Sequence, residues 1–269
     1  PKIALSVRDL RKETETFRSA GKDRTEKNFE FGRTLIAAER LSVRYGSHLA
    51  LSPINLNIRS GEILALMGRN GAGKSSLIKS LLGLINYQGK VTKSERKIGY
   101  IPQDANDLLY HQSVSAECSQ TDTDHDLAPG STFELLNKIV PSISLDAHPR
   151  DLSEGQRLAL VLAIVLAPNP EVLILDEPTR GLDYQAKSLL IGQLTTRAKN
   201  GSAVLIATHD VELVAELATR IVILADGDLV ADGPAIDVLL ASPAFAPQVT
   251  KVMSPRKWIT INDVLEATE

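Results

Sequence analysis

The chain has 269 residues, 43% of them hydrophobic, with a net charge of −3 and one cysteine, Cys118. This length allows one large domain, or one domain with a smaller lobe. The near balance of charge disfavours a general nucleic-acid binder, which would carry a basic excess. One cysteine excludes a disulfide framework and a cysteine zinc cluster within the chain, and no apolar run is long enough to span a membrane.

Residues 1–33 are predicted to be an N-terminal extension or interdomain linker. Residues 11–33 are polar and mixed in charge, with little apolar periodicity, which is typical of a flexible or loosely docked segment. The apolar residues 3–7 could form a separate strand. The chain begins at Pro1 rather than methionine, which indicates either processing or a piece of a longer polypeptide.

Ordered structure is predicted to start at Leu35. Residues 35–38 and 41–43 indicate a strand pair or one bent strand, and residues 54–58 alternate apolar and polar, as an antiparallel strand with one solvated face would. A turn follows at residues 60–61. Ile63–Met67 is a continuous apolar run, typical of a buried parallel strand.

Residues 68–75 read Gly-Arg-Asn-Gly-Ala-Gly-Lys-Ser and fit the phosphate-binding pattern G-x-x-x-x-G-K-[ST]. Glycines allow backbone N–H groups to converge on phosphate oxygens, and a helix starting near Gly73 would direct its positive dipole end at the same anion. Lys74 would neutralise the β- and γ-phosphates, and the Ser75 hydroxyl would bind Mg²⁺. The predicted nucleotide contacts of this segment are Gly68, Asn70, Gly71, Gly73, Lys74, Ser75 and Ser76.

The alternative is a glycine turn before an ordinary helix. The surroundings disfavour it, because the apolar run before the loop predicts a strand, and Leu77, Ile78, Leu81 and Leu82 follow at helical spacing. Strand, glycine loop and helix therefore come in the order that a phosphate site requires.

A small, mostly helical lobe is predicted over about residues 104–166. Its part over residues 104–150 differs in character from the rest of the chain, and one helix is predicted there at residues 132–140. Near its end, Ser153 and Gln156 form an S-x-x-Q capping box, which predicts a helix start. By pattern alone, a simple cap on a core helix is the favoured interpretation. Gln103, directly before the lobe, could equally be an ordinary loop residue.

Two strand ends carry the remaining candidates for chemistry. Residues 172–175 are apolar and lead into Asp176 and Glu177, which would lie at the carboxyl edge of a parallel sheet, where ligands of open α/β folds bind. Asp176 would hold Mg²⁺, and Glu177 would orient or deprotonate an attacking water. His209 follows the apolar residues 203–207 and could donate to a γ-phosphate at the same edge. The alternative for both acids is a solvated strand end.

The rest of the chain is predicted to finish the domain and extend it. A helix is expected at residues 211–219 and a strand at 221–224. Asp226-Gly227 indicates a type I′ hairpin to residues 229–230. Residues 241–269, with the single tryptophan Trp258, are treated as a C-terminal extension.

The ordered set of motifs over residues 35–240 resembles the ATP-binding cassette (ABC) ATPases. The resemblance implies a P-loop α/β core of mostly parallel sheet, with an antiparallel β subdomain and an inserted helical subdomain. Position by position, it implies adenine stacking by Tyr45, a Q-loop glutamine at Gln103 that also binds the metal, and a signature motif at residues 152–156 with nucleotide contacts from Ser153, Gly155 and Gln156. It also implies a dimer-facing loop at Asp183 and a switch histidine at His209. Ser75, Gln103 and Asp176 are the expected metal ligands, and Glu177, His209 and Lys74 are the expected catalytic residues.

One residue departs from the family pattern. The signature is usually Leu-Ser-Gly-Gly-Gln, and here Glu154 replaces the first glycine. A carboxylate in the first turn suits the helix dipole but would repel phosphate if it pointed inward. We therefore expect a working signature in which Glu154 faces away.

A narrower resemblance connects the chain with energy-coupling-factor (ECF) vitamin importers. The run from Asp176 to Asp183, with Arg180, is similar to their ATPases, and the tail through Trp258 resembles the second cassette of fused two-cassette members. This likeness implies ATP and Mg²⁺ as cofactors, a second cassette closing head to tail, and transmembrane subunits that place the chain peripherally at the cytoplasmic face of the cell membrane. The substrate would be a vitamin or a metal ion, and no nucleic-acid partner is expected.

The alternative is a non-transport ABC ATPase acting on nucleic acid, ribosomes or metal-cluster assembly. DNA-repair members usually carry a long heptad coiled coil, and ribosome-acting members a long basic linker; neither is visible in this sequence.

Overall fold

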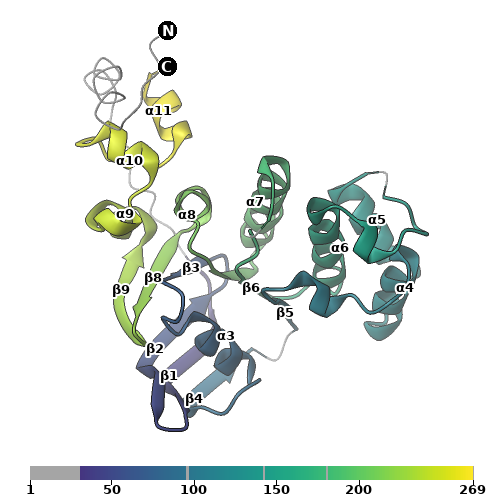
Figure 1. Ribbon diagram of the computed structural model, residues 1–269, viewed down its shortest axis with the longest axis horizontal. Coiled ribbons are helices and arrows are strands. Elements are labelled where there is room, and N and C mark those ends of the chain that lie inside the picture. The colour runs from purple at the N-terminus through teal and green to yellow at the C-terminus, as the bar shows by residue number, and fades with distance from the viewer. Residues whose placement is uncertain (1–30, 95–96, 142, 180, 269) are drawn as a thin grey trace.

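The computed structural model describes residues 31–94, 97–141, 143–179 and 181–268. The predicted N-terminal extension before residue 31, including the strand at residues 3–7, and Arg180 lie outside the described residues. The described chain forms two β-sheets, a set of helices packed on them, a helical lobe at one side and a C-terminal group of short helices (Figure 1). The predicted mixed α/β fold class is confirmed.

A six-stranded sheet forms the centre of the molecule. Its order is β5-β6-β7-β3-β8-β9, in which the first five strands are parallel and β9 is antiparallel to β8. The strands are β3 (Ile63–Met67), β5 (Ile98–Ile101), β6 (Val172–Asp176), β7 (Ala203–Ala207), β8 (Arg220–Ala225) and β9 (Asp228–Pro234). The β8–β9 turn has positive φ at both Asp226 and Gly227, as the predicted type I′ hairpin requires.

Strand β3 shows why the central strands have continuous apolar sequences. All five of its residues are buried. Ile63, Ala65 and Met67 belong to one hydrophobic cluster, and Leu64 and Leu66 belong to another on the opposite face of the sheet. Alternate side chains therefore enter different cores, and both faces of the strand must be apolar.

A smaller antiparallel sheet, in the order β2-β1-β4, completes the second of these cores. It contains β1 (Thr34–Tyr45), β2 (His48–Arg59) and β4 (Gln88–Lys93). Of the two arrangements predicted for residues 35–43, the structure shows the single bent strand. Arg40 has a φ of 49°, and its N–H bonds to Asn55 Oδ1 at 2.8 Å, where the pairing shifts register.

Helices fill the spaces around the sheets. Helix α3 (Lys74–Leu82) follows β3 and packs against strands of both sheets. The other face of the central sheet is covered by α7 (Tyr184–Lys199), α8 (Val211–Leu217) and α9 (Ala235–Ala241) (Figure 1).

The helical lobe stands to one side of the sheets (Figure 1). It contains α4 (Val114–Asp124), α5 (Ser131–Ile139) and α6 (Glu154–Leu166), with 3₁₀ turns at Ala105–Leu108 and Pro149–Asp151. Helix α5 matches the helix predicted at residues 132–140. Helix α4 and strand β4 were not predicted, because their sequences lack a clear apolar period. Leu108 and Leu109 pack on the core.

The C-terminal residues form a small cluster of their own. After a 3₁₀ turn at Pro243–Phe245 come α10 (Gln248–Met253) and α11 (Ile261–Thr268). Trp258 is fully buried and packs with Val252 and Met253. Within the described residues, every helix is too short or too polar to cross a bilayer.

Candidate functional site

The loop between β3 and α3 is held in place by its neighbours. Gly68 has a φ of 149°, and a Cβ there would collide with the Leu224 carbonyl of β8. A Cβ at Gly73, where φ is 102°, would lie 2.8 Å from the Ala50 carbonyl oxygen of β2. Only glycine allows the loop to pass this closely to both strands. The sequence at these two positions therefore reflects backbone packing as well as any anion that the loop binds.

Lys74 begins α3, and its side chain folds back over the loop. Its Nζ donates to the carbonyl oxygens of Gly68 at 2.8 Å and Arg69 at 3.3 Å, and it lies 3.6 Å from Glu177 Oε1. Only 6% of the Lys74 side chain is exposed. A single buried ammonium thus stands between the helix N-terminus and the acidic end of β6, in the place that a bound polyphosphate tail requires.

Glu177 leaves β6 in an unusual backbone conformation. Its φ is 50°, and its N–H bonds to the Ala207 carbonyl oxygen at the end of β7 at 2.8 Å. The side chain points back over the sheet edge, where Oε2 lies 2.8 Å from His209 Nδ1. A positive φ is uncommon for a residue with a side chain, and such strain concentrates at functional sites. Neighbouring parallel strands thus bring Glu177 and His209 into contact.

Asp176 is the more deeply buried of the two acids. It is 3% exposed. Burial raises the pKa of its carboxyl group, the charge of Glu177 raises that pKa further, and the hydrogen bond from the Ser75 side chain opposes both. Asp176 Oδ1 and Glu177 Oε1 accept no hydrogen bond although both are buried. Buried acceptors without donors indicate a place where a ligand or a cation is expected.

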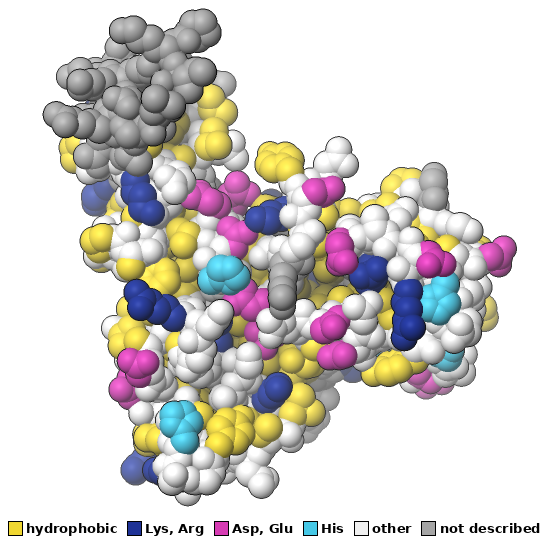
Figure 2. Space-filling model, viewed as in Figure 1, with side chains coloured by type: hydrophobic (Ala, Val, Ile, Leu, Met, Phe, Trp, Pro, Cys, Tyr) yellow, Lys and Arg dark blue, Asp and Glu magenta, His cyan; other side chains and the backbone are white. Residues whose placement is uncertain are grey.

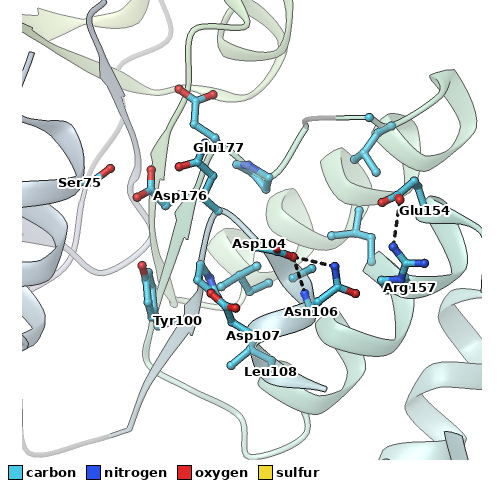
Figure 3. A pocket seen from close by; sticks show the side chains of 18 of the residues that line it. Ser75, Tyr100, Asp104, Asn106, Asp107, Leu108, Glu154, Arg157, Asp176 and Glu177 are labelled. Carbon is cyan, nitrogen blue, oxygen red and sulfur yellow. Dashed lines mark hydrogen bonds and ion pairs between the residues drawn. The ribbon is translucent and has the colours of Figure 1, made fainter. Parts of the chain in front are cut away.

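The chemistry of these residues fits a magnesium site. Mg²⁺ is held by few protein oxygens and keeps water and phosphate ligands. In Figure 3 the side chains of Ser75 and Asp176 face each other, and Gln103 lines the same cleft. Among the described residues there is no group of three or more His, Cys, Asp or Glu side chains placed to hold a metal ion. A hydroxyl, a carboxylate and an amide are therefore the oxygen ligands that the protein offers here.

A cleft of about 970 Å³ opens from this edge towards the helical lobe. Figure 2 shows acidic side chains gathered around the hollow in the middle of this face. Residues from the core and from the lobe line the cleft, among them Ser75, Tyr100, Gln103, Asp104, Asp107, Leu108, Glu154, Arg157, Asp176 and Glu177 (Figure 3). Leu109 and Tyr110, which follow Leu108 in the chain, do not line it, although Tyr110 is 77% exposed.

Tyr45 lies beside the loop, at the end of β1. Its ring is half exposed, and its hydroxyl is 3.4 Å from Ser76 Oγ in the first turn of α3. Asn70 and Gly71 are exposed on the outer side of the same loop. The structure thus gathers all the residues predicted around the phosphate loop, with an aromatic face at its rim.

The predicted signature residues lie elsewhere. Ser153 Oγ accepts from the Gln156 N–H at 3.3 Å, and Gln156 Oε1 accepts from the Ser153 N–H at 3.1 Å, so the predicted capping box is confirmed at the start of α6. This helix belongs to the lobe, apart from α3 (Figure 1). Gly155 packs near Ala186 of α7, and Asp183 caps α7 through the Ala186 N–H. The structure does not bring the signature to the phosphate loop of the same chain.

Two features of the site could not be predicted from the sequence. The left-handed backbone of Glu177 has no signal, because the residue is not glycine or asparagine. The guanidinium of Arg157 joins Glu154 to the loop before α6; the i, i+3 spacing of opposite charges was the only available indication.

Comparisons with known proteins agree with this geometry. The sequence model of the family described as ABC transporter matches residues 51–180. A Streptomyces coelicolor protein named as an ABC transporter ATP-binding protein is 51% identical over 240 residues, which are 84% of this chain and 43% of that protein. The chain therefore spans less than half the length of this relative.

A shorter relative is matched over most of its length. The energy-coupling factor transporter ATP-binding protein EcfA2 of Clostridium tetani is 30% identical over 236 residues, which are 77% of this chain and 82% of that protein. Among solved structures, CbiO1 of Clostridium perfringens, described as part of the ABC transporter complex CbiONQ, has a TM-score of 0.69 and 27% identity, covering 82% of this chain and 95% of that one. The chain belongs to the family of ABC transporter ATP-binding proteins, whose members bind and hydrolyse ATP.

Proposed function

We propose that the chain is the ATP-hydrolysing motor cassette of an ECF-type importer of a vitamin or a metal ion. The observation that carries the proposal is the meeting of Lys74, Asp176, Glu177 and His209 at one edge of the parallel sheet. The likeness to EcfA2 and to CbiO1 supports the ECF assignment. Membrane subunits would hold the cassette at the cytoplasmic face and choose the cargo.

The phosphate loop would bind the nucleotide before hydrolysis. Backbone amides from Gly68 to Ser75 and the positive end of α3 would surround the β- and γ-phosphates, and Lys74 would neutralise them. Ser75, Gln103 and Asp176 would hold Mg²⁺, which shields phosphate charge when bound. The ring of Tyr45, half exposed beside the loop, would stack on the base.

The hydrolytic step falls to Glu177. Its Oε1 is buried without a hydrogen-bond donor, so it can accept a proton from a water that attacks the γ-phosphorus. The contact between Oε2 and His209 Nδ1 fixes the direction of the carboxylate. Only as an imidazolium would His209 donate from Nδ1 to Glu177 and from its other ring nitrogen to the γ-phosphate, and it would then respond to the loss of that phosphate.

A second cassette would complete the site. The signature residues Ser153, Gly155 and Gln156 lie at the N-terminus of α6, in the lobe and apart from α3 (Figure 1). This separation supports a head-to-tail arrangement in which they would meet a nucleotide across an interface. ATP would bind the closed pair better than the open one and shift the equilibrium towards closure.

The cleft beside Gln103 would receive the membrane subunit. It offers apolar side chains from Leu84 and Leu108 and carboxylates from Asp104 and Asp107. A short amphipathic helix fits such a surface. Because Gln103 lines the same cleft as Ser75 and Asp176, a movement of the lobe would change the surroundings of the proposed metal ligands.

The test separates binding from hydrolysis. Lys74→Ala should lower ATP affinity by at least tenfold and abolish turnover, since the buried ammonium has no substitute. Glu177→Gln should bind ATP normally but lower the hydrolysis rate by about 10³-fold or more, and it should accumulate a closed dimer on size-exclusion chromatography with ATP. Full turnover by Glu177→Gln would remove this carboxylate from its assigned role.

A further inference from the structure

Arg157, in the first turns of α6, forms a hub of hydrogen bonds. Its Nη1 donates to Glu154 Oε1 at 2.9 Å, and its Nη2 donates to the carbonyl oxygens of Leu152 at 3.0 Å and Arg150 at 3.2 Å. Its Nε makes a longer contact of 3.4 Å to the Pro149 carbonyl oxygen. Only 14% of the side chain is exposed. One guanidinium thus meets three backbone carbonyl oxygens before the helix and one carboxylate oxygen in its first turn.

Other hydrogen bonds also hold this segment: the Arg150 N–H donates to His148 Nδ1 at 3.0 Å, and the Ser153–Gln156 capping box closes its end. Within it, the Asp151 N–H donates to the His148 carbonyl oxygen at 2.9 Å, and the Leu152 N–H donates to the Pro149 carbonyl oxygen at 3.4 Å. Arginine suits the task because its planar fork carries five donors in fixed directions, whereas lysine offers one compact ammonium. The Arg157 side chain therefore adds bonds to three backbone carbonyls of residues 149–152, directly before the Ser153 cap.

The contact between Arg157 and Glu154 also has an electrostatic effect, because it pairs the negative charge of Glu154. Its side chain is 60% exposed at the end of the helix that carries the signature. Figure 3 shows its carboxylate joined to Arg157, across the cleft from Asp176. Without a partner, this charge would stand in front of the helix N-terminus, where it would repel an approaching phosphate.

We propose that Arg157 is a positioning residue for the signature segment, which fixes residues 149–153 and holds the Glu154 carboxylate away from the nucleotide of the opposing cassette. The effect on the opposing nucleotide rests on the proposed head-to-tail arrangement, whereas the fixing of residues 149–153 concerns the single chain. The pair explains how the helix can carry an acid where the family usually has a glycine.

Arg197 provides a matched control at the other end of α6. Its Nη1 donates to Asn169 Oδ1 at 2.7 Å, and its Nη2 donates to the Leu166 carbonyl oxygen at 3.3 Å. Arg197→Ala thus also removes an arginine that bonds to a backbone carbonyl of α6, but far from the signature.

The first experiment measures ATP hydrolysis by the full-length protein with its partner cassette. Arg157→Ala should lower kcat/KM for ATP by about tenfold, equivalent to about 1.4 kcal/mol, and added salt should reduce the loss because part of it is charge repulsion. Adding Glu154→Gln to Arg157→Ala should recover about threefold. Arg197→Ala should lower the thermal midpoint without a salt-dependent loss of activity. Equal behaviour of the two alanine variants, or no recovery in the double variant, would overturn the electrostatic role.

The second experiment needs no partner. Amide hydrogen exchange over residues 149–156 in the nucleotide-free protein should speed up at least tenfold in Arg157→Ala and in Arg157→Lys, but stay unchanged in Arg197→Ala. Unchanged exchange in Arg157→Ala would refute the positioning role. If exchange speeds up while Lys74→Ala and Glu177→Gln both retain full ATPase activity, the proposed motor function fails and the positioning role stands.

Discussion

At the scale of single residues, the buried carboxylate of Asp176 is expected to serve the site while lowering the stability of the fold. Its Oδ1 accepts no hydrogen bond, and burial raises the pKa of the group. An acid whose pKa is higher in the folded state than in the unfolded state destabilises the fold once it ionises. The penalty is absent below the ordinary aspartate pKa of about 3.9, and it grows as the pH rises through the raised folded value.

Asp176→Asn should therefore stabilise the nucleotide-free protein at pH 8. The expected gain is about 1–3 kcal/mol from removal of one desolvated negative charge, and the difference from wild type should vanish near pH 3.5. Thermal unfolding across this pH range measures it, with the exposed Asp146 changed to asparagine as the control. A constant difference at every pH would show that ionisation of Asp176 is not the cause.

At the scale of elements, two constraints require glycine at position 68 of the phosphate loop, whereas a comparable glycine in the helical lobe is under only one. Gly68 combines a positive φ with the close Leu224 carbonyl, whereas Gly130, at the start of α5, has a φ of 89° and no atom within 4 Å of the position that a Cβ would take. Gly130→Ala should cost about 1 kcal/mol from backbone strain alone. Gly68→Ala should cost about 3 kcal/mol or more, because strain and collision add.

Chemical denaturation of both alanine variants checks this difference. ATP binding should be lost in Gly68→Ala and kept in Gly130→Ala. Similar losses of stability in the two variants would mean that the loop can move away from β8 at little cost.

The elements that the sequence predicted well are those with one dominant signal. Ile63–Met67 is a continuous apolar run, Val172–Asp176 is an apolar run that ends in an aspartate, and the S-x-x-Q pattern at Ser153 predicted the start of α6. Helix α4 was not predicted, because it is held in place by polar side chains of a kind that is usually exposed to solvent. Its Asp122 is buried and accepts hydrogen bonds from Thr132 and Gly130, at the start of α5. Long-range capping of this kind has no local pattern.

Some features of the candidate site could also be predicted from the sequence, and others could not. The order of the motifs predicted which residues would meet at the sheet edge, because the carboxyl ends of neighbouring parallel strands converge. The pairing of Glu177 with His209 depends on a left-handed backbone at Glu177, and the Arg157 contacts depend on the path of residues 149–152. Both are consequences of tertiary packing, so neither could be predicted from residue types alone.

At the scale of the whole molecule, Arg220 joins the two sheets. Its guanidinium donates to the Asn57 carbonyl oxygen of β2, to Glu62 before β3 and to Asp232 of β9. Glu62 is fully buried. These partners raise the pKa of Arg220, the hydrogen bond to Asp232 most of all, so the arginine stays charged at every working pH.

Arg220→Met should lower stability by about 3–5 kcal/mol, because it leaves a buried carboxylate uncompensated. Adding Glu62→Gln should restore part of that loss, whereas adding Asp232→Asn should restore less, since Asp232 is partly exposed. Urea unfolding of the three variants measures these differences. No recovery with Glu62→Gln would show that the buried charge is not what Arg220 balances.

The turn between β8 and β9 has a wider consequence for how variants of this protein will be interpreted. Gly227 donates from its N–H to the Ala72 carbonyl oxygen at 3.3 Å and accepts from the Ser52 N–H at 2.9 Å, so a distant hairpin forms the back wall of the phosphate loop. Sequence changes there touch no ligand, yet they would tilt the amides that do. In a genetic screen for lost transport, such alleles would look like weakened nucleotide affinity, and they would map more than 150 positions away from the motif whose geometry they disturb.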